Sequence, residues 1–394
     1  MSRKTHPWGA PPWTIDFCPA AGPLPEQVDF AIVGGGFTGL SAAAWLRRLT
    51  PGKSVLVLEA SSLGEGASGR TGGLALAETA AGPLPGLGDV LAGYKKILRM
   101  LHIDAWFKLT GVWELGRSNP AKGSPISWND SGSLQVVRTV PGGDVDPGRL
   151  VSGLARAAER AGAQIVEHAE VYAIDYSNPP RLQVRQKIRA RIQEKEICAD
   201  QILLATNAFS LELSDLHGAT QPKLTLALGT APLTAAQLKA IGLFSRHPFY
   251  TLDLPYLWGR LLASNGVVFG AGLVPMPASI ASLFAKPAKN SQQFAAPNLY
   301  RFDVRKGEAA RSFRWLEGRV HHLHPALESV RITHRWAGPI LLTEGMRPIF
   351  RRHPRSENVI VLAGYNGHGV ALSVYLGQWA AEALLGTRLL PSWS

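Results

Sequence analysis

Short hydrophobic runs separated by glycine-rich turns dominate the start of the chain. Residues 28–33 are apolar except for one aspartate, and three consecutive glycines follow them. Small and apolar residues at helical spacing then occupy positions 38–49, and Pro51 and Gly52 end this pattern. A second apolar run covers residues 54–58. This order predicts a strand, a helix and a second, parallel strand, which together form one βαβ unit.

The same two periodicities recur in the middle and at the end of the chain. Residues 150–161 have the spacing of a helix that starts after Asp146 and Pro147. Residues 201–206 and 359–363 are apolar on both faces, which is typical of strands in a parallel sheet. We further expect strands at 164–174 and 182–192, a strand-rich stretch at 223–272 and a closing helix at 370–385.

Two segments lack either periodicity. Residues 6–27 are rich in proline and tryptophan, which predicts an extended arm that lies on the surface of the protein. Residues 274–303 contain several Pro, Ala and Ser residues without a pattern, and we expect an inserted loop or lid there.

The composition is that of a globular protein with two domains. Hydrophobic residues make up 46% and charged residues 18% of the 394 positions, and a domain averages roughly 150 residues. No apolar run approaches the roughly 20 residues of a membrane span, and prolines interrupt the region where a signal peptide needs a continuous apolar core. We therefore expect a cytoplasmic protein. Cys18 and Cys198 are the only cysteines, so neither a disulfide framework nor a metal site is expected.

The net charge is +12, which permits acidic partners. The positive residues are scattered, however, as in 181–191 and 351–355, and form no continuous stripe. Nucleic acid is therefore an unlikely partner. The oligomeric state cannot be inferred from the sequence.

A dinucleotide-binding motif joins the first strand to the first helix. Gly34 permits the tight turn, Gly36 allows a pyrophosphate to approach the backbone, and Gly39 allows the helix to pack closely on the strand. Glu59 ends the second strand 20 residues after Gly39, where a carboxylate can accept hydrogen bonds from both ribose hydroxyls. The free N–H groups at the helix start favour phosphate binding.

A second cluster of small residues, 64–73, follows Glu59. Its backbone N–H groups and the Ser68 hydroxyl can reach a second phosphate, and Arg70 can add positive charge.

Together these motifs make the sequence resemble the D-amino-acid-oxidase-like (DAO) family of FAD-dependent oxidoreductases, and within it the gamma-glutamylputrescine oxidoreductase branch. Three further stretches carry the resemblance: 146–171, 199–208 and 364–371, the last of which reads Gly-Tyr-Asn-Gly-His-Gly-Val-Ala. The resemblance implies non-covalent FAD, because neither cysteine falls in these motifs. In addition to Gly34, Gly36, Gly39, Glu59, Ser68 and Arg70, it implies these FAD-binding residues: Phe37, Thr38, Ala60, Gly69, Thr71, Gly72, Gly73, Val171, Thr206, Asn207, Ala208, Trp336, Gly338, Gly364, Gly367, His368, Gly369 and Val370.

The resemblance also implies the fold and its division along the chain. We expect an α/β protein with a Rossmann-type FAD-binding domain, a parallel sheet with helices on both faces, and an α+β substrate domain with a mostly antiparallel sheet. The expected FAD-binding segments are 28–85, 146–222 and 330–394, the substrate domain is 86–145 and 223–329, and the arm is 1–27.

Departures from the family pattern indicate the substrate class. Amino acid oxidases of the family often carry Trp-x-Gly-x-Arg-Pro, whose arginine pairs with the substrate carboxylate. Here Ile340 occupies the place of that arginine after Trp336, and Ala371 stands where sarcosine oxidases place a lysine. Both losses favour a primary or secondary amine without an adjacent carboxylate. Arg260 could still supply a cation.

Several residues are candidates for contact with the reacting groups. His368 is expected near the flavin ring. Trp336 and Tyr256, with Trp113, Trp258 and Tyr365, could surround a substrate ammonium group, although most of them also suit core packing.

The expected activity is hydride transfer from the carbon beside the nitrogen to FAD. The imine that results would hydrolyse to an aldehyde and an amine or ammonia, with molecular oxygen as the expected electron acceptor. The alternatives are an N-methyl or D-amino acid oxidase or dehydrogenase, a flavoprotein subunit that passes electrons to a partner, and a flavoenzyme that modifies nucleic acid.

Overall fold

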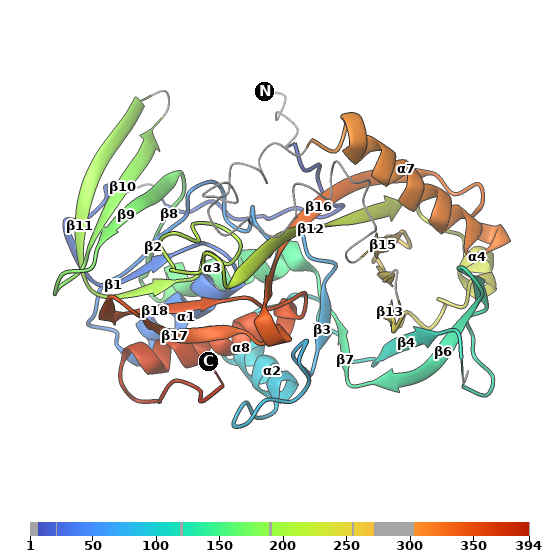
Figure 1. Cartoon of the computed structure of the whole chain (residues 1–394), viewed down its shortest axis with the longest axis horizontal. Helices are drawn as coiled ribbons and strands as arrows, with labels where there is room; N and C mark the ends of the chain where they lie inside the picture. Colours follow the sequence, from blue (N-terminus) through green and yellow to red (C-terminus); the bar gives the residue numbers. More distant parts are fainter. Residues whose placement is uncertain are drawn as a thin grey trace.

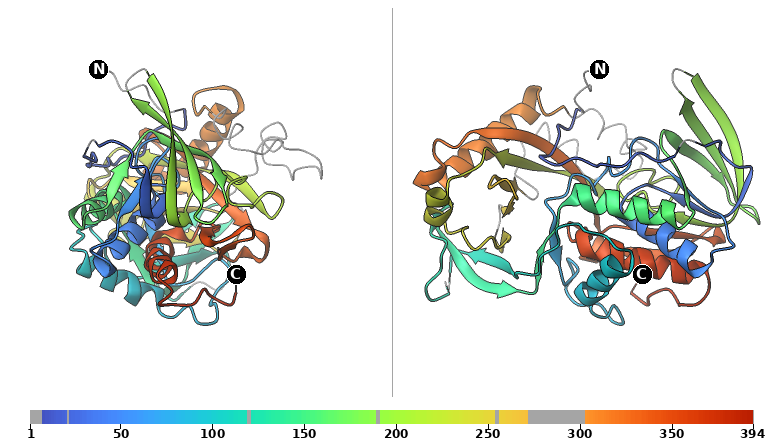
Figure 2. Two further views of the ribbon diagram at one scale, coloured as in Figure 1. Left: turned by 90° about the vertical axis from the view of Figure 1, so that its left-hand side faces the viewer. Right: turned by 180° about the vertical axis from the view of Figure 1, so that it is seen from behind.

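The computed structural model describes residues 7–20, 22–118, 121–188, 191–253, 256–271 and 303–393. They form two large β-sheets that lie side by side, each with helices of its own (Figure 1). Figure 2 shows the same two lobes from one end and from behind. A two-stranded sheet, β3 (Leu74–Leu76) with β7 (Gly142–Asp144), lies between them.

The first sheet contains five parallel strands in the order β18-β11-β1-β2-β8, and β17 is antiparallel at one edge. The predicted βαβ unit is confirmed, because β1 leads through helix α1 to β2 and the two strands pair in parallel. The strands of the first sheet are β1 (Gln27–Val33), β2 (Val55–Leu58), β8 (Gln164–Val166), β9 (Ala169–Asp175), β10 (Arg181–Ile188), β11 (Arg191–Leu204), β17 (Ile349–His353) and β18 (Ser356–Ala363).

Four helices belong to this sheet: α1 (Phe37–Leu49), α2 (Val90–Met100), α3 (Pro147–Arg160) and α8 (Gly369–Leu384). Helix α3 begins as predicted, since the Asp146 carboxylate accepts a hydrogen bond from the Arg149 amide at 2.9 Å and Pro147 occupies the first turn. Helix α8 is apolar on almost every side and is largely buried.

The two faces of the first sheet are covered differently. Ile32 and Val57 pack in one hydrophobic cluster with α1, α3 and α8, whereas Ala31 and Leu56 pack in another with Leu182 of β10. The α/β class is therefore confirmed, and in the described part of the chain α1, α3 and α8 pack on one face while β10 packs on the other. The physical reason is that the strands β9 and β10, rather than a helix, connect β8 to β11 and cover the second face.

The second sheet has the order β16-β12-β15-β14-β13-β4-β6-β5 and is antiparallel except for the β13–β4 pair, as expected for a substrate domain. Its strands are β4 (Val112–Gly116), β5 (Trp128–Asn129), β6 (Ser133–Val140), β12 (Thr220–Thr230), β13 (Phe249–Thr251), β14 (Trp258–Leu261), β15 (Val267–Ala271) and β16 (Ile332–Thr343). The helices of this lobe are α4 (Ala235–Ala240) and α7 (Gly307–His322), with 3-10 turns η3 (Pro325–Leu327) and η4 (Glu344–Met346) in the linking segments.

Two elements lie in a different lobe from the one to which the expected domain boundaries assign them. Strand β16 belongs to the second sheet, although segment 330–394 was expected to be FAD-binding. Helix α2 packs on α8, although segment 86–145 was expected in the substrate domain. Both elements are amphipathic or apolar and give no indication of which partner they cover, so the sequence could not place them.

The N-terminal arm is extended, as predicted, and lies against both lobes (Figure 1). The Ala337 amide of β16 donates to the Trp8 carbonyl at 2.8 Å, and the Trp8 side chain is buried. The Trp13 indole N–H donates to the Gly69 carbonyl at 2.8 Å. The arm therefore joins the second sheet to the loop that follows Glu59.

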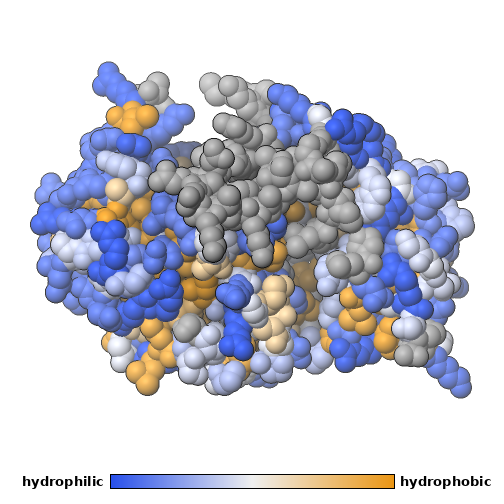
Figure 3. Space-filling model, in the orientation of Figure 1, coloured by the Kyte–Doolittle hydropathy of each residue, from blue (hydrophilic) through white to orange (hydrophobic). Residues whose placement is uncertain are grey.

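The face drawn in Figure 3 shows apolar residues between the two lobes, whereas the outer surfaces of both lobes are mainly hydrophilic. The expected loop or lid at 274–303 lies, apart from Asp303, outside the described residues.

Candidate cofactor and substrate site

A cavity of about 700 Å³ runs between the two sheets. This volume is typical of sites for cofactors and small molecules, which span roughly 300–1,000 Å³. One end, which we call the nucleotide end, is lined by the turn after β1, the segment after β2, and residues of β9 and of the segment after β11. The other end, which we call the second-sheet end, is lined by residues of β12, β16 and the β13–β14 connection.

The glycine turn at the nucleotide end has the geometry that its motif predicts. Gly34 has a φ of +112°, and a Cβ atom there would lie 2.7 Å from the Ala205 carbonyl oxygen. A Cβ atom on Gly39 would lie 2.0 Å from the Gly34 carbonyl oxygen, so only glycine lets α1 pack this closely. Gly36 lines the cavity, as do Phe37 and Thr38, which begin α1.

Glu59 has both carboxylate oxygens fixed. Its Oε2 accepts from the Gly35 amide at 2.8 Å and its Oε1 from the Ser61 amide at 2.9 Å. Burial raises the pKa of Glu59, while the two amide hydrogen bonds lower it. Glu59 and Ala60 both line the cavity at the end of β2, where the motif predicts a ribose contact.

The loop 64–73 closes over the glycine turn. The Ser68 hydroxyl accepts from the Phe37 amide at 2.9 Å, which caps the start of α1. Arg70 is buried, and its Nε and Nη2 donate to the Glu65 carbonyl and carboxylate while Nη1 donates to the Gly9 carbonyl. The Arg70 side chain therefore serves to hold the loop and the arm in place.

The cavity wall contains two buried hydroxyl groups without a hydrogen-bond partner among the described residues. They are Thr206 Oγ1, just beyond β11, and Ser373 Oγ, in the first turns of α8. An unpaired buried hydroxyl costs roughly 1–3 kcal/mol, which a bound polar ligand would recover. Together with the glycine turn and Glu59, these groups fit a dinucleotide cofactor. Ser373 was not predicted, although it lies four residues after Gly369 and so on the same helix face.

The C-terminal motif joins the same wall. Asn207 adopts a φ of +51°, and its side-chain oxygen accepts from the Gly364 amide at 3.0 Å. The Tyr365 hydroxyl lies 2.7 Å from Thr38 Oγ1 of α1. His368 precedes α8 and lines the cavity, and burial lowers the pKa of its imidazole, so the ring is neutral at neutral pH.

The structure brings most of the predicted cofactor residues together in this cavity. Besides the residues described above, the predicted cofactor residues that line the cavity are Thr71, Gly72, Val171, Thr206, Asn207, Gly338, Gly367, Gly369 and Val370. Those that lie behind the lining are Gly39, Gly69, Gly73, Ala208, Gly364 and Trp336.

Two of the predicted catalytic residues lie behind the lining. Trp336 is fully buried, and its indole N–H donates to the Arg70 carbonyl at 2.9 Å. Arg260 is also buried, and its Nε donates to the Gly72 carbonyl at 2.5 Å while Nη1 lies 3.5 Å from Asp144 Oδ2. Both side chains support the loop 64–73 from beneath, so neither has the placement of a substrate contact. Tyr256 and His368, the other two, do line the cavity.

The second-sheet end contains a polar pair that the sequence analysis missed. Tyr250 lines the cavity, and its hydroxyl donates to the Glu114 carboxylate, which is buried in β4 and also pairs with Arg138. Burial and the hydrogen bond to Glu114 raise the pKa of Tyr250, so the phenol keeps its proton. The available indication was a glutamate inside the apolar run Val-Trp-Glu-Leu-Gly.

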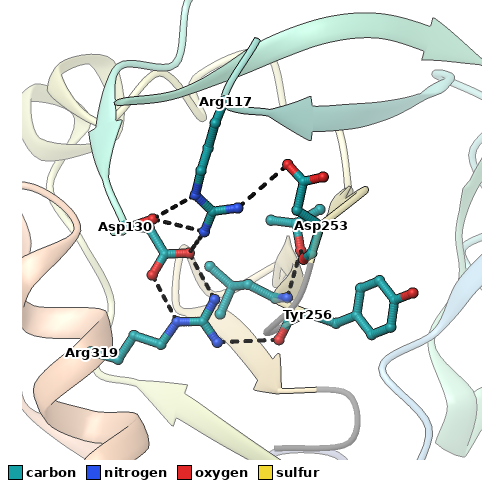
Figure 4. A network of polar contacts seen from close by, with 7 residues as sticks. Arg117, Asp130, Asp253, Tyr256 and Arg319 are labelled. Carbon is teal, nitrogen blue, oxygen red and sulfur yellow. Dashed lines mark hydrogen bonds and ion pairs between the residues drawn. The ribbon is translucent and has the colours of Figure 1, made fainter. Parts of the chain in front are cut away.

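A buried ionic network fixes the wall near Tyr256 (Figure 4). Asp130 is 5% exposed, and its carboxylate accepts from Arg319 Nε at 2.9 Å and Nη2 at 2.7 Å. Arg319 Nη1 also donates to the Tyr256 carbonyl at 3.2 Å, and Arg117 binds the Asp130 carbonyl and lies 3.5 Å from Asp253. The network thus ties the β13–β14 connection to α7 and to the β5–β6 turn.

Other kinds of site find no support in the described ranges. No helix there is long and apolar enough to cross a membrane, and no group of three or more His, Cys, Asp and Glu side chains there could hold a metal ion. Cys18 and Cys198 are both free and lie outside the cavity lining.

Comparisons with known proteins agree with this geometry. A family model for the FAD-dependent oxidoreductases named DAO matches residues 29–130 and 134–383. Gamma-glutamylputrescine oxidoreductase of Escherichia coli (strain K12) is 26% identical over 404 residues, which cover 91% of this chain and 84% of that protein.

Solved structures show the same fold. Glycine oxidase from Geobacillus kaustophilus matches with a TM-score of 0.65 at 19% identity, covering 93% of this chain and 96% of that one. L-amino acid deaminase from Proteus myxofaciens matches with a TM-score of 0.68 at 14% identity, covering 98% and 95%. The expected family and FAD as its cofactor are confirmed: the chain belongs to the DAO family of FAD-dependent oxidoreductases.

Proposed function

We propose that this enzyme oxidises the C–N bond of a primary or secondary amine that has no carboxylate beside the nitrogen. The observation that carries the proposal is the absence of an available cation in the described cavity wall. Arg70 is the single Lys or Arg in that lining, and its three nitrogens donate to Glu65 and Gly9. Ile340, in the place of the family's arginine, lines the cavity with an apolar side chain.

A carboxylate in such a site would lose its hydration without gaining an ion pair. Burial of an unpaired charge costs several kcal/mol, whereas a bidentate arginine normally compensates that cost. Arg260 is not a replacement, because it is buried behind Gly72 and pairs with Asp144. An α-amino acid is therefore the weaker candidate.

The nucleotide end suits non-covalent FAD. We propose that the turn at Gly34–Gly36 and the start of α1 hold the pyrophosphate, that Glu59 binds the ribose, and that the Thr206 and Ser373 hydroxyls complete the contacts. FAD held there would supply a hydride acceptor for the carbon beside the nitrogen, and the resulting imine would hydrolyse to an aldehyde and an amine or ammonia. The neutral His368 adds no charge that would repel an amine cation.

The test is an anaerobic titration of the purified holoenzyme, with the flavin absorbance band as the readout. Hexylamine and N-methylhexylamine represent carboxylate-free amines, and norleucine is an unbranched amino acid that also has six carbons, one of them in the carboxylate beside the carbon that carries the nitrogen. Bleaching by an amine but not by norleucine is the expected result. Bleaching by norleucine alone would overturn the proposal and favour an amino acid oxidase.

Molecular oxygen is the electron acceptor that we propose. Readmission of air should restore the flavin band within seconds and produce hydrogen peroxide. A reduced flavin that persists in air until an artificial acceptor is added would instead identify a dehydrogenase or a subunit that passes electrons to a partner protein.

A further inference from the structure

The second-sheet end of the cavity narrows the class of amine, provided that the proposed function holds. Its polar groups are few. The Thr251 hydroxyl accepts from the Leu257 amide at 2.8 Å and donates to the Asp253 carbonyl at 3.2 Å, so its proton and one of its two lone pairs are used within the wall. The Thr225 hydroxyl donates to the Gly338 carbonyl at 3.4 Å. Among the described residues that line this end, Tyr250 is the one whose hydroxyl donates to a buried carboxylate.

The hydroxyl of Tyr250 is polarised in one direction. Its proton is donated to the Glu114 carboxylate, which Arg138 holds in place through two further contacts. The phenol oxygen therefore keeps lone pairs for a second partner, and that partner must be a donor. An amine N–H is such a donor, whereas a substrate carboxylate has no proton to offer. The negative charge of Glu114 behind the ring strengthens this acceptor.

The rest of this end is apolar. Leu76, Leu252, Leu257, Ile340, Leu342 and Met346 line it, and the rings of Tyr256 and Trp258 complete the described wall. The charged residues of the lining, Glu59, Glu65, Arg70, Glu170 and Glu212, come from segments of the nucleotide end. A substrate group that extends into the second-sheet end meets hydrocarbon and aromatic surface.

We propose that the substrate is an amine with an apolar body, whose nitrogen donates a hydrogen bond to the phenol oxygen of Tyr250. A second charged group at the far end of the substrate would enter the apolar wall without a partner. This excludes diamines and polyamines as good substrates and favours alkyl or arylalkyl amines with a single nitrogen. Tyr250 binds and orients the substrate, and Glu114 positions Tyr250.

The first test compares hexylamine with 1,6-diaminohexane, which differ only in a second ammonium group at the far end. We expect the apparent affinity in the anaerobic titration to be at least about tenfold weaker for the diamine, because its far charge loses hydration without compensation. Equal or stronger flavin reduction by the diamine would overturn this inference. It would leave the proposed function standing, since that function depends on the comparison of hexylamine with norleucine.

The second test replaces the phenol oxygen. Tyr250→Phe should raise KM for hexylamine about tenfold, the effect of one hydrogen bond to a polarised group, while the flavin content stays at one per chain. Glu114→Gln should raise KM by a smaller factor, because the amide oxygen still accepts the phenol proton. Tyr94→Phe is the matched control, since Tyr94 is buried under α8 with no hydrogen-bond partner among the described residues. A KM for Tyr250→Phe equal to that of the Tyr94 control would contradict the assignment.

Discussion

The two ends of the cavity are built in opposite ways. At the nucleotide end, residues of a single segment, 34–73, supply the glycine turn, the Glu59 carboxylate and the loop that caps α1. At the second-sheet end, β4, the β5–β6 turn, the β13–β14 connection, α7 and β16 must meet before the wall exists.

This difference follows from what we propose each end binds. A dinucleotide is recognised largely through backbone N–H groups, and glycines at fixed spacing create that backbone shape. An amine substrate is recognised by side chains, which can come from any element that faces the cavity. The nucleotide end should therefore be sensitive to changes in backbone shape, and the second-sheet end to changes in side-chain networks.

Gly34→Ala should produce the largest effect, because it directly changes the backbone conformation of the glycine turn. The methyl group would meet the Ala205 carbonyl at 2.7 Å and force a non-glycine residue to a φ of +112°. Strain and overpacking together should cost about 4 kcal/mol of unfolding free energy and abolish FAD binding. Urea unfolding and the flavin content measure both outcomes. Gly52→Ala is the control, since its Cβ meets nothing within 4 Å, and a Gly34 variant as stable as this control would refute the prediction.

Asp130→Asn should produce the second-largest effect, at the second-sheet end of the cavity. It removes the charge that Arg319 and Arg117 share in a buried setting, which should cost about 3 kcal/mol of stability. Because the network also holds the Tyr256 carbonyl and Asp253, KM for the amine should rise several-fold while FAD affinity stays unchanged. Asp104→Asn, which removes an exposed pair with Arg149, should cost less than about 1 kcal/mol. Loss of FAD from the Asp130 variant would show that the two ends are not independent.

The same contrast explains what the sequence could reveal. The βαβ unit, the start of α3 at Asp146 and the glycine turn depend on neighbours close in the chain, and they were predicted correctly. Arg260 and Trp336 were expected to contact substrate, but they lie behind the cavity because their buried partners, Gly72 and Arg70, are remote in sequence. No local pattern records such contacts.

The site residues that were not predicted also depend on contacts between segments remote in sequence. Tyr250 and Glu114 are separated by more than a hundred positions and become neighbours only when β13 pairs with β4. Asp130 and Arg319 are further apart still. Such pairs can be predicted only when the strand order of the second sheet is known.

Glu59→Gln should produce a smaller effect that stays at the nucleotide end. The carboxylate accepts one amide hydrogen bond on each oxygen, so the amide nitrogen of glutamine would face the N–H of either Gly35 or Ser61. Loss of a hydrogen bond to a charged group, about 1.5–3 kcal/mol, should weaken FAD binding roughly 10- to 100-fold. The dissociation constant can be measured by quenching of flavin fluorescence. Glu194→Gln on β11, where the carboxylate pairs with exposed Arg185, is the control; equal FAD affinities of the two variants would disprove the role of Glu59.

The smallest expected effect is a pH dependence from His368, which lines the cavity just before α8. Burial lowers the pKa of this imidazole below its usual 6.5, so acidification protonates it in the unfolded chain before the folded one. Its contribution to stability is therefore present above pH 6.5 and is lost as the pH falls below that value. In urea unfolding of the FAD-free protein, His368→Asn should reduce the loss of stability between pH 7.5 and 5.5. His334 and His353, whose pKa values burial also lowers, give the same sign and remain in both proteins, so the difference isolates His368. An equal or larger loss in the variant would mean that the ring is protonated in the folded state, and the cavity wall would then contain a further cation.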